Sequence, residues 1–179
     1  MNHQAAELFL RYSASRLDAL ASWIDECLSR LTVEQLWWRG GEAQNAIGNL
    51  VVHLCANVHQ RITLALGKGG RDTRNRDGEF DLRLTGSPEE LRRQLSTTIA
   101  EAVAVLRQCP PGQVTEHAPR PGYDRSILEN IYTVVEHFAM HAGQIMYATK
   151  LLTKQGLGEL SRSKKAAPGA AADAGAVSE

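Results

Sequence analysis

Four long segments of the sequence repeat apolar residues every three or four positions, and this periodicity restricts the fold more than any other feature. The segments cover about residues 4–31, 45–66, 87–108 and 125–155. Such spacing places apolar side chains along one face of an α-helix. Because few runs alternate β-branched and polar residues, the pattern predicts an all-α protein in which four helices pack as a four-helix bundle.

Local signals predict where some of these helices begin and end. In the segment SPEEL, Ser87 is the expected N-cap, Pro88 occupies the first helical position, and Glu90 completes a capping box. Asn45 is a second candidate N-cap. Gly156 is the expected residue just beyond the last helix, where glycine readily adopts a left-handed conformation.

The connections between the helices predict a particular helix order. Residues 67–86 and 109–124 form two long linkers, whereas an up-down-up-down bundle needs only short turns. Long crossover connections therefore favour a different order of helices. Residues 161–179 are small, polar and low in complexity, so we expect a disordered tail after a single domain over residues 1–160.

Composition excludes some classes of partner and indicates a compartment. The chain has 20 Lys+Arg and 20 Asp+Glu, with a pI near 7.0, whereas nucleic-acid-binding domains usually carry a basic surface and a high pI. No apolar run reaches the roughly 18 residues that a membrane span needs. The three cysteines are widely spaced and no secretory signal is recognisable, which predicts reduced thiols and a cytoplasmic protein.

Two histidines in the last helical segment indicate a metal site. His137 and His141 stand one helical turn apart within an apolar run, the spacing at which two imidazoles can converge on one ion. The alternative is that they are core histidines hydrogen-bonded to protein groups. A metal needs at least one further ligand, and His53, in the middle of the second helix, is the best candidate. Cys55 is a weaker one, because a lone buried cysteine is more often a core residue.

The remaining histidines are expected to be structural or solvated. His59 lies about 240° around the helix from His53 and cannot share its ion. His3 lies near the N-terminus, and His117 lies in a predicted loop.

The sequence resembles the DinB-like (damage-inducible) family, in particular a small bacterial branch of it. The resemblance rests on NAIGNLVVHLCANVHQRI in the second helix, on GGRDTRNRDGEF in the linker and on VVEHFAMHAGQIMYATKLL in the last helix, and it covers residues 4–155. It implies a four-helix bundle of unusual helix order, frequently a homodimer. It also implies a divalent metal, such as zinc or nickel, held by the residues that match here, His53, His137 and His141.

The resemblance further implies chemistry on small thiols. Better-understood relatives transfer or rearrange mycothiol, bacillithiol or glutathione, although some have a carboxylate where this chain has His137. Three neutral imidazoles leave a coordination position open, as catalytic zinc sites do. We therefore expect a metal-dependent thiol transferase. A metal-dependent hydrolase and a non-catalytic module for metal binding or sensing are the alternatives.

Several polar and aromatic residues are candidates for supporting roles. Gln144 lies one turn beyond His141, where it would either hydrogen-bond near the metal or pack against a neighbouring helix. Asn49 and Asn57 share the face of His53. The linker residues Arg74, Arg76, Glu79 and Phe80 are expected to fix the crossover by ion pairing, and Trp37 and Trp38 to line either the mouth of a pocket or a dimer interface.

Overall fold

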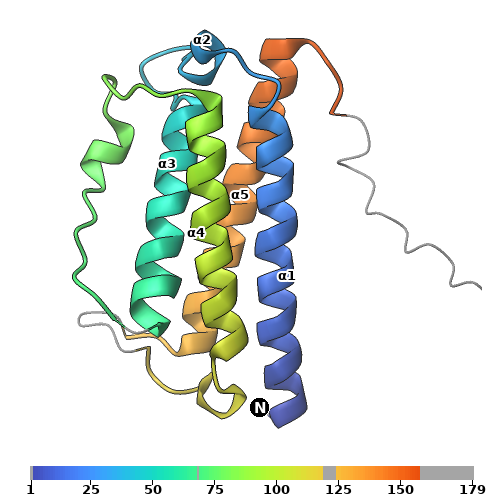
Figure 1. Cartoon of the computed structure of the whole chain (residues 1–179), viewed down its shortest axis with the longest axis vertical. Helices are drawn as coiled ribbons and strands as arrows, with labels where there is room; N and C mark the ends of the chain where they lie inside the picture. The colour runs from blue at the N-terminus through green and yellow to red at the C-terminus, as the bar shows by residue number, and fades with distance from the viewer. Residues whose placement is uncertain (1, 68, 119–123, 158–179) are drawn as a thin grey trace, which may run out of the picture.

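The protein is a bundle of four long helices, described here from a computed structural model that covers residues 2–67, 69–118 and 124–157. Within these residues the structure has no β-strand, which confirms the predicted all-α fold class. The long helices lie side by side (Figure 1): α1 (His3–Leu28), α3 (Ile47–Val58), α4 (Pro88–Gln108) and α5 (Ile127–Thr153). The short elements are α2 (Val33–Leu36), the π-helix η1 (His59–Leu64) and the 3₁₀-helices η2 (Asp77–Phe80) and η3 (Pro111–Gln113).

The helix order follows from one long connection. Helix α1 packs on α4 and α5, and α3 packs on the same two helices, so α1 and α3 occupy opposite corners of the bundle. The linker between η1 and α4 runs along the outside of α3 and returns the chain to the end of the bundle where α3 begins (Figure 1). Helices α3 and α4 consequently run in the same direction. The prediction that residues 109–124 form a second crossover is wrong, because α4 ends and α5 begins at the same end of the bundle (Figure 1).

The core consists of the apolar stripes of the four helices. The largest fully buried side chains come from every long helix and include Leu17, Ile24, Leu54, Leu95, Leu106, Ile131, Phe138 and Ile145. Removing such side chains from water is the main favourable contribution to folding. The predicted capping box of α4 is confirmed, with Ser87 accepting from the backbone of Glu90 and Glu90 accepting from the backbone of Ser87.

Two predicted helix ends are wrong. Helix α3 begins after Ala46, which provides no side-chain cap, so Asn45 is not the N-cap. Helix α5 ends at Thr153, and the next residue, Lys154, takes the left-handed conformation (φ 55°) that was expected of Gly156. Its N-terminus is closed by a capping box of Ser126 and Glu129 that the sequence analysis overlooked. Because caps depend on one or two hydrogen bonds, competing local geometry displaces them easily.

The segment between α1 and α3 contains the short helix α2, which the periodicity did not predict. After α2, Trp37 donates its indole N–H to the carbonyl of Gly86 at 2.9 Å and so joins the segment to the start of α4. Its ring packs against Gly48, where an added Cβ would stand only 2.6 Å from the ring. Gly48 therefore permits the close approach of Trp37 to α3, and Trp37 is a packing residue.

No helix in the described part of the chain is long and apolar enough to cross a membrane. The predicted disordered tail, 161–179, lies outside the described residues.

Candidate metal centre

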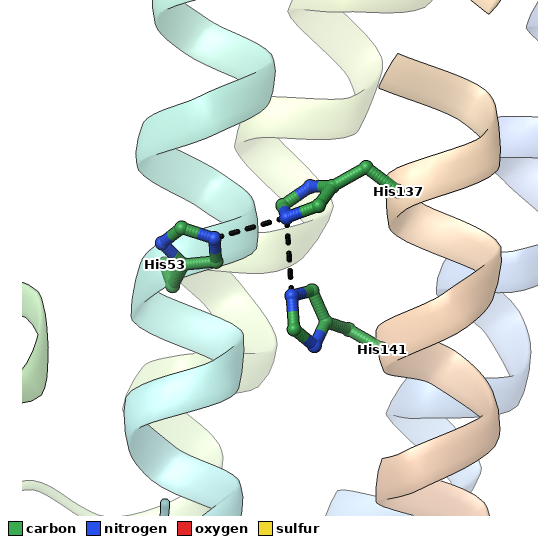
Figure 2. Close-up of side chains that lie close together, drawn as sticks. All are labelled: His53, His137 and His141. Carbon is green, nitrogen blue, oxygen red and sulfur yellow. Dashed lines mark hydrogen bonds between the residues drawn. The ribbon is translucent and has the colours of Figure 1, made fainter. Parts of the chain in front are cut away.

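Three histidines from two neighbouring helices meet at one point in the bundle. His53 lies in the middle of α3, and His137 and His141 lie one turn apart on α5, so that their imidazole rings point toward one another (Figure 2). The Nε2 atom of His137 lies 3.1 Å from the Nε2 atoms of both His53 and His141. All three ligand atoms fall within 4.8 Å of one another. The structure thus brings together the three residues that the sequence analysis selected.

These distances suit a metal ion bound by three imidazoles. A tetrahedral zinc ion with Zn–N bonds of about 2.0–2.1 Å would separate two ligand nitrogens by about 3.3 Å. The measured 3.1 Å between His137 and each of the other rings is close to this value. The rings also meet nearly edge to face, with interplanar angles of 73–89°, which directs their Nε2 atoms toward a shared point (Figure 2).

The hydrogen-bond partners of the Nδ1 atoms of His53 and His141 determine which ring nitrogen carries the proton. His53 Nδ1 lies 2.7 Å from Glu79 Oε2, and His141 Nδ1 lies 2.7 Å from Gln144 Oε1. A carboxylate or amide oxygen only accepts hydrogen bonds, so each Nδ1 donates its hydrogen outward. The Nε2 atoms of His53 and His141 then present lone pairs to the centre. Of the two positions predicted for Gln144, the structure has the one hydrogen-bonded to a candidate ligand.

Hydrogen bonds between the three rings cannot satisfy both nitrogens of His137. Its Nε2 atom faces two lone pairs, and one N–H can donate along only one direction. Its Nδ1 atom is buried and has no hydrogen-bond partner among the described residues. Three lone pairs that converge on one point are mutually repulsive, whereas a cation at that point would bind all three. The residues present therefore fit a divalent metal.

The surroundings keep the histidines neutral, as metal ligands must be. Burial, together with the nearby charges of His141, His53, Arg61 and Arg74, lowers the pKa of His137 to about 4. Burial also lowers the pKa of His53, although the hydrogen bond to Glu79 opposes this effect. At neutral pH both rings are therefore free of the proton that would compete with a metal.

Glu79 connects the linker to the candidate site. Its carboxylate is buried, accepts from His53, and is bound by Arg74 through Nε–Oε1 (2.6 Å) and Nη2–Oε2 (2.9 Å). Burial alone would raise the pKa of Glu79, but the hydrogen bonds from Arg74 and His53 outweigh it and lower the pKa. The linker is held in turn by Asn49, whose side-chain amide donates to the backbone carbonyls of Glu79 and Asp81.

This arrangement matches the predicted ion pairing of the linker but goes beyond it. Arg74 and Glu79 form the expected pair, and Phe80 packs beside the ring of His53 at 4.9 Å between centroids. Glu79 also contacts a candidate ligand, which the sequence did not predict. The only available signal was a polar strip on α3 that required a polar partner, and spacing alone could not identify which linker residue meets it.

We expect Glu79→Gln to weaken metal binding by roughly 10- to 100-fold, the usual effect of losing a partner that orients a ligand. Glutamine keeps the size of the side chain but removes the charge that pairs with Arg74 and strengthens the bond from His53. A competition titration with a chromophoric chelator would measure the affinity. Glu129→Gln, which alters an exposed capping carboxylate on α5, is the control, and equal affinities in the two variants would contradict this role for Glu79.

A cavity of about 470 Å³ adjoins the three-histidine cluster. Two of the three histidines, His53 and His137, form part of its wall. The other residues that line it are Asn57, Gln60, Arg61, Arg74, Arg76 and Thr133. The candidate metal centre is therefore accessible to a small molecule from this side.

The other residues that the sequence analysis considered lie away from the centre. Cys55 is buried, and burial raises the pKa of its thiol to about 12, as expected for a core residue. His59 is half exposed near Glu101, and His3 and His117 are exposed beside Glu7 and Asp124. Trp38 lines a different hollow, together with Gln144, Tyr147 and Leu151.

Comparisons with known proteins found one family model and a solved structure of similar fold. A family model described as "Protein of unknown function (DUF1572)" matches residues 4–166. The solved structure described as "Crystal structure of the conserved protein of locus from Enterococcus faecalis" is similar with a TM-score of 0.63 and 15% identity, covering 80% of this chain and 96% of that chain. At this identity the similarity shows the fold alone. A search of curated protein sequences returned no significant match.

Proposed function

The chain belongs to the family described as Protein of unknown function (DUF1572), and we propose that it binds a divalent metal ion, zinc or nickel, and activates a low-molecular-weight thiol for transfer. His53, His137 and His141 would hold the ion. The observation that carries the proposal is the convergence of three imidazole Nε2 atoms beside a cavity. The resemblance of the helix and linker motifs to the DinB-like family supports the choice of thiol chemistry.

Three protein ligands leave a coordination position available for a substrate. A divalent ion bound there supplies Lewis acidity, which favours the deprotonated form of a thiol at neutral pH. The transfer itself forms one bond between the thiol sulfur and an electrophilic carbon of a second substrate. The bond from that carbon to its leaving group breaks, the leaving group takes the electron pair, and the thiol proton is released to solvent.

The protein residues would position the reactants. Glu79 and Gln144 fix the orientation of His53 and His141, because each accepts the outward N–H of its ring. His137 needs no such acceptor to remain neutral, since burial lowers its pKa. The cavity beside His53 and His137 would hold the body of the thiol and bring its sulfur to the three rings.

We also propose that the protein is a cytoplasmic homodimer. The free state of Cys27, Cys55 and Cys109 supports a reducing compartment. Exposed apolar side chains of α5, among them Tyr147 and Leu151, lie next to Trp38 around one hollow, and such patches frequently form contacts between subunits.

Titration of the cobalt-substituted protein with thiols tests the proposal. Binding of sulfur to the ion should add a sulfur-to-cobalt absorption band, whereas a thiol that only occupies the cavity should leave the spectrum unchanged. Cysteine, 2-mercaptoethanol and glutathione would serve as probes, with the matching alcohols or disulfides as controls. If no thiol changes the spectrum of protein that carries cobalt stoichiometrically, a non-catalytic metal-binding module or a hydrolase becomes the better interpretation.

A further inference from the structure

The cavity beside the three histidines has a strongly cationic wall. Three arginines, Arg61, Arg74 and Arg76, contribute to it, and no aspartate or glutamate among the described residues does. Arg74 is bound by the buried Glu79 behind the wall. Arg76 is exposed and forms no ion pair with any described residue, so its charge remains available to a ligand.

Arg61 brings a second positive charge to the wall of the cavity. The π-helix η1 directly continues α3. His53 and Asn57 of α3 and Arg61 of η1 are spaced four residues apart, and all three line the cavity. The backbone carbonyl of Arg61 accepts from the buried Asn130 of α5 at 2.7 Å, which fixes this turn against the helix that carries His137 and His141. Arg61 and His137 line the same cavity.

A buried acceptor on the same wall indicates that the cavity is built for a polar ligand. Asn57 is only 6% exposed, and its Oδ1 atom has no hydrogen-bond partner among the described residues. An unsatisfied buried polar group costs about 1–3 kcal/mol, and a donor on a bound molecule would remove that cost. Gln60 is already engaged by Asp72 and Arg74, so it keeps the wall in place.

We infer that the small molecule accepted by this cavity carries an anionic group, a carboxylate or a phosphate, which Arg76 and Arg61 bind while another part of the molecule faces the three histidines. With the proposed function, on which this inference rests, the substrate is an anionic thiol. A cavity of about 470 Å³ lies within the usual range for small-molecule sites. Guanidinium groups bind both anions through charge-assisted hydrogen bonds.

Matched pairs of thiols test the inference in the cobalt-substituted protein. Each ω-mercaptocarboxylate, from three to six carbons, is compared with the mercaptoalcohol of the same length, and the sulfur-to-cobalt band reports binding. We expect the acid to bind about tenfold more tightly than the alcohol at the best chain length, since a charge-assisted hydrogen bond contributes at least this much. Inorganic phosphate and acetate, added as competitors, distinguish a phosphate-preferring from a carboxylate-preferring site.

Charge-removing variants connect the preference to the cavity. In Arg76→Gln the acid should lose its advantage and bind within about twofold of the alcohol. Arg93→Gln removes the same charge from an exposed position of α4 outside the cavity and should keep the tenfold preference. Arg61→Gln should also reduce the preference, and its metal content reports whether the site stays intact.

Two failures are distinguishable. If acid and alcohol bind equally at every chain length, or if the preference survives in both Arg76→Gln and Arg61→Gln, the cavity does not select anions and the inference is overturned, whereas thiol binding stands. If neither series changes the cobalt spectrum, the proposed function fails and the anionic-thiol inference fails with it.

Discussion

His141→Ala should leave the purified protein with less than about a tenth of the metal of the unaltered chain, because two imidazoles hold a divalent ion far more weakly than three. The same loss is expected for His53→Ala and His137→Ala, since all three Nε2 atoms converge on one point. Metal analysis by mass spectrometry, after dialysis against a weak chelator, would measure the metal content of each variant.

His59→Ala is the matched control for these variants. His59 follows α3 directly, but it is half exposed and lies near Glu101 rather than near the cluster. Its removal should leave about one ion per chain. Stoichiometric metal in His141→Ala would contradict the assignment, and circular dichroism of each variant would show whether the helices remain formed.

Acidification should release the ion from the unaltered protein. A proton competes with the metal for each Nε2 atom, so affinity falls as pH drops below the pKa values of the free histidines. Because the pKa of His137 is lowered to about 4 and that of His53 is also lowered, these two rings should stay available to the metal below pH 6.5. In the metal-free protein the same shifts reduce stability as pH falls from 6.5 toward 4, since the unfolded state binds those protons first.

Helical periodicity was sufficient to predict the fold class and the shared face of His137 and His141. His137 and His141 share a face at any four-residue spacing on a helix. His53 required one further step, that α3 and α5 are neighbours, which the resemblance to a known family implied. Burial of the apolar stripes then fixes how the helices rotate, and so directs all three rings inward.

The partners of the histidines depended on the path of a loop and were not predictable in the same way. Glu79 reaches His53 only because the linker runs along α3 and is tied there by Asn49 and Arg74. No periodicity encodes such a path, since loop conformation depends on hydrogen bonds between residues far apart in sequence. The contact between Gln144 and His141 could be predicted, because the two residues lie one turn apart on the same helix.

The ends of the helices show a third kind of difficulty. Gly156 was the reasonable candidate for a left-handed residue, yet Lys154 adopts that conformation. The left-handed region costs a non-glycine residue roughly 1–2 kcal/mol, which packing beyond the helix is able to offset. The buried Leu157 follows the turn closely and belongs to the core, so burial of this residue competes with the local preference of glycine.

The metal-loaded protein should accelerate the conjugation of a small thiol to a reactive electrophile, and this prediction separates an enzyme from a binding module. An alkyl halide with a chromophoric leaving group allows the rate to be followed directly. Chelation or His137→Ala should reduce the rate to that of the uncatalysed reaction. Added metal should restore the rate of the chelated protein but not that of His137→Ala. His59→Ala should keep the full rate.

The pH dependence of the rate is the more discriminating measurement. Free thiols have a pKa of about 8.5, so an uncatalysed conjugation slows about tenfold for each pH unit below that value. If the site determines the ionisation of the thiol, the catalysed rate should remain nearly constant between pH 8.5 and 6.5 and should fall only where protonated histidines release the metal. A rate that follows the ionisation of the free thiol would mean that the protein concentrates the reactants without activating the sulfur. A rate equal to the chelated control at every pH would instead favour the non-catalytic module, because the three histidines would then hold a metal that no substrate reaches.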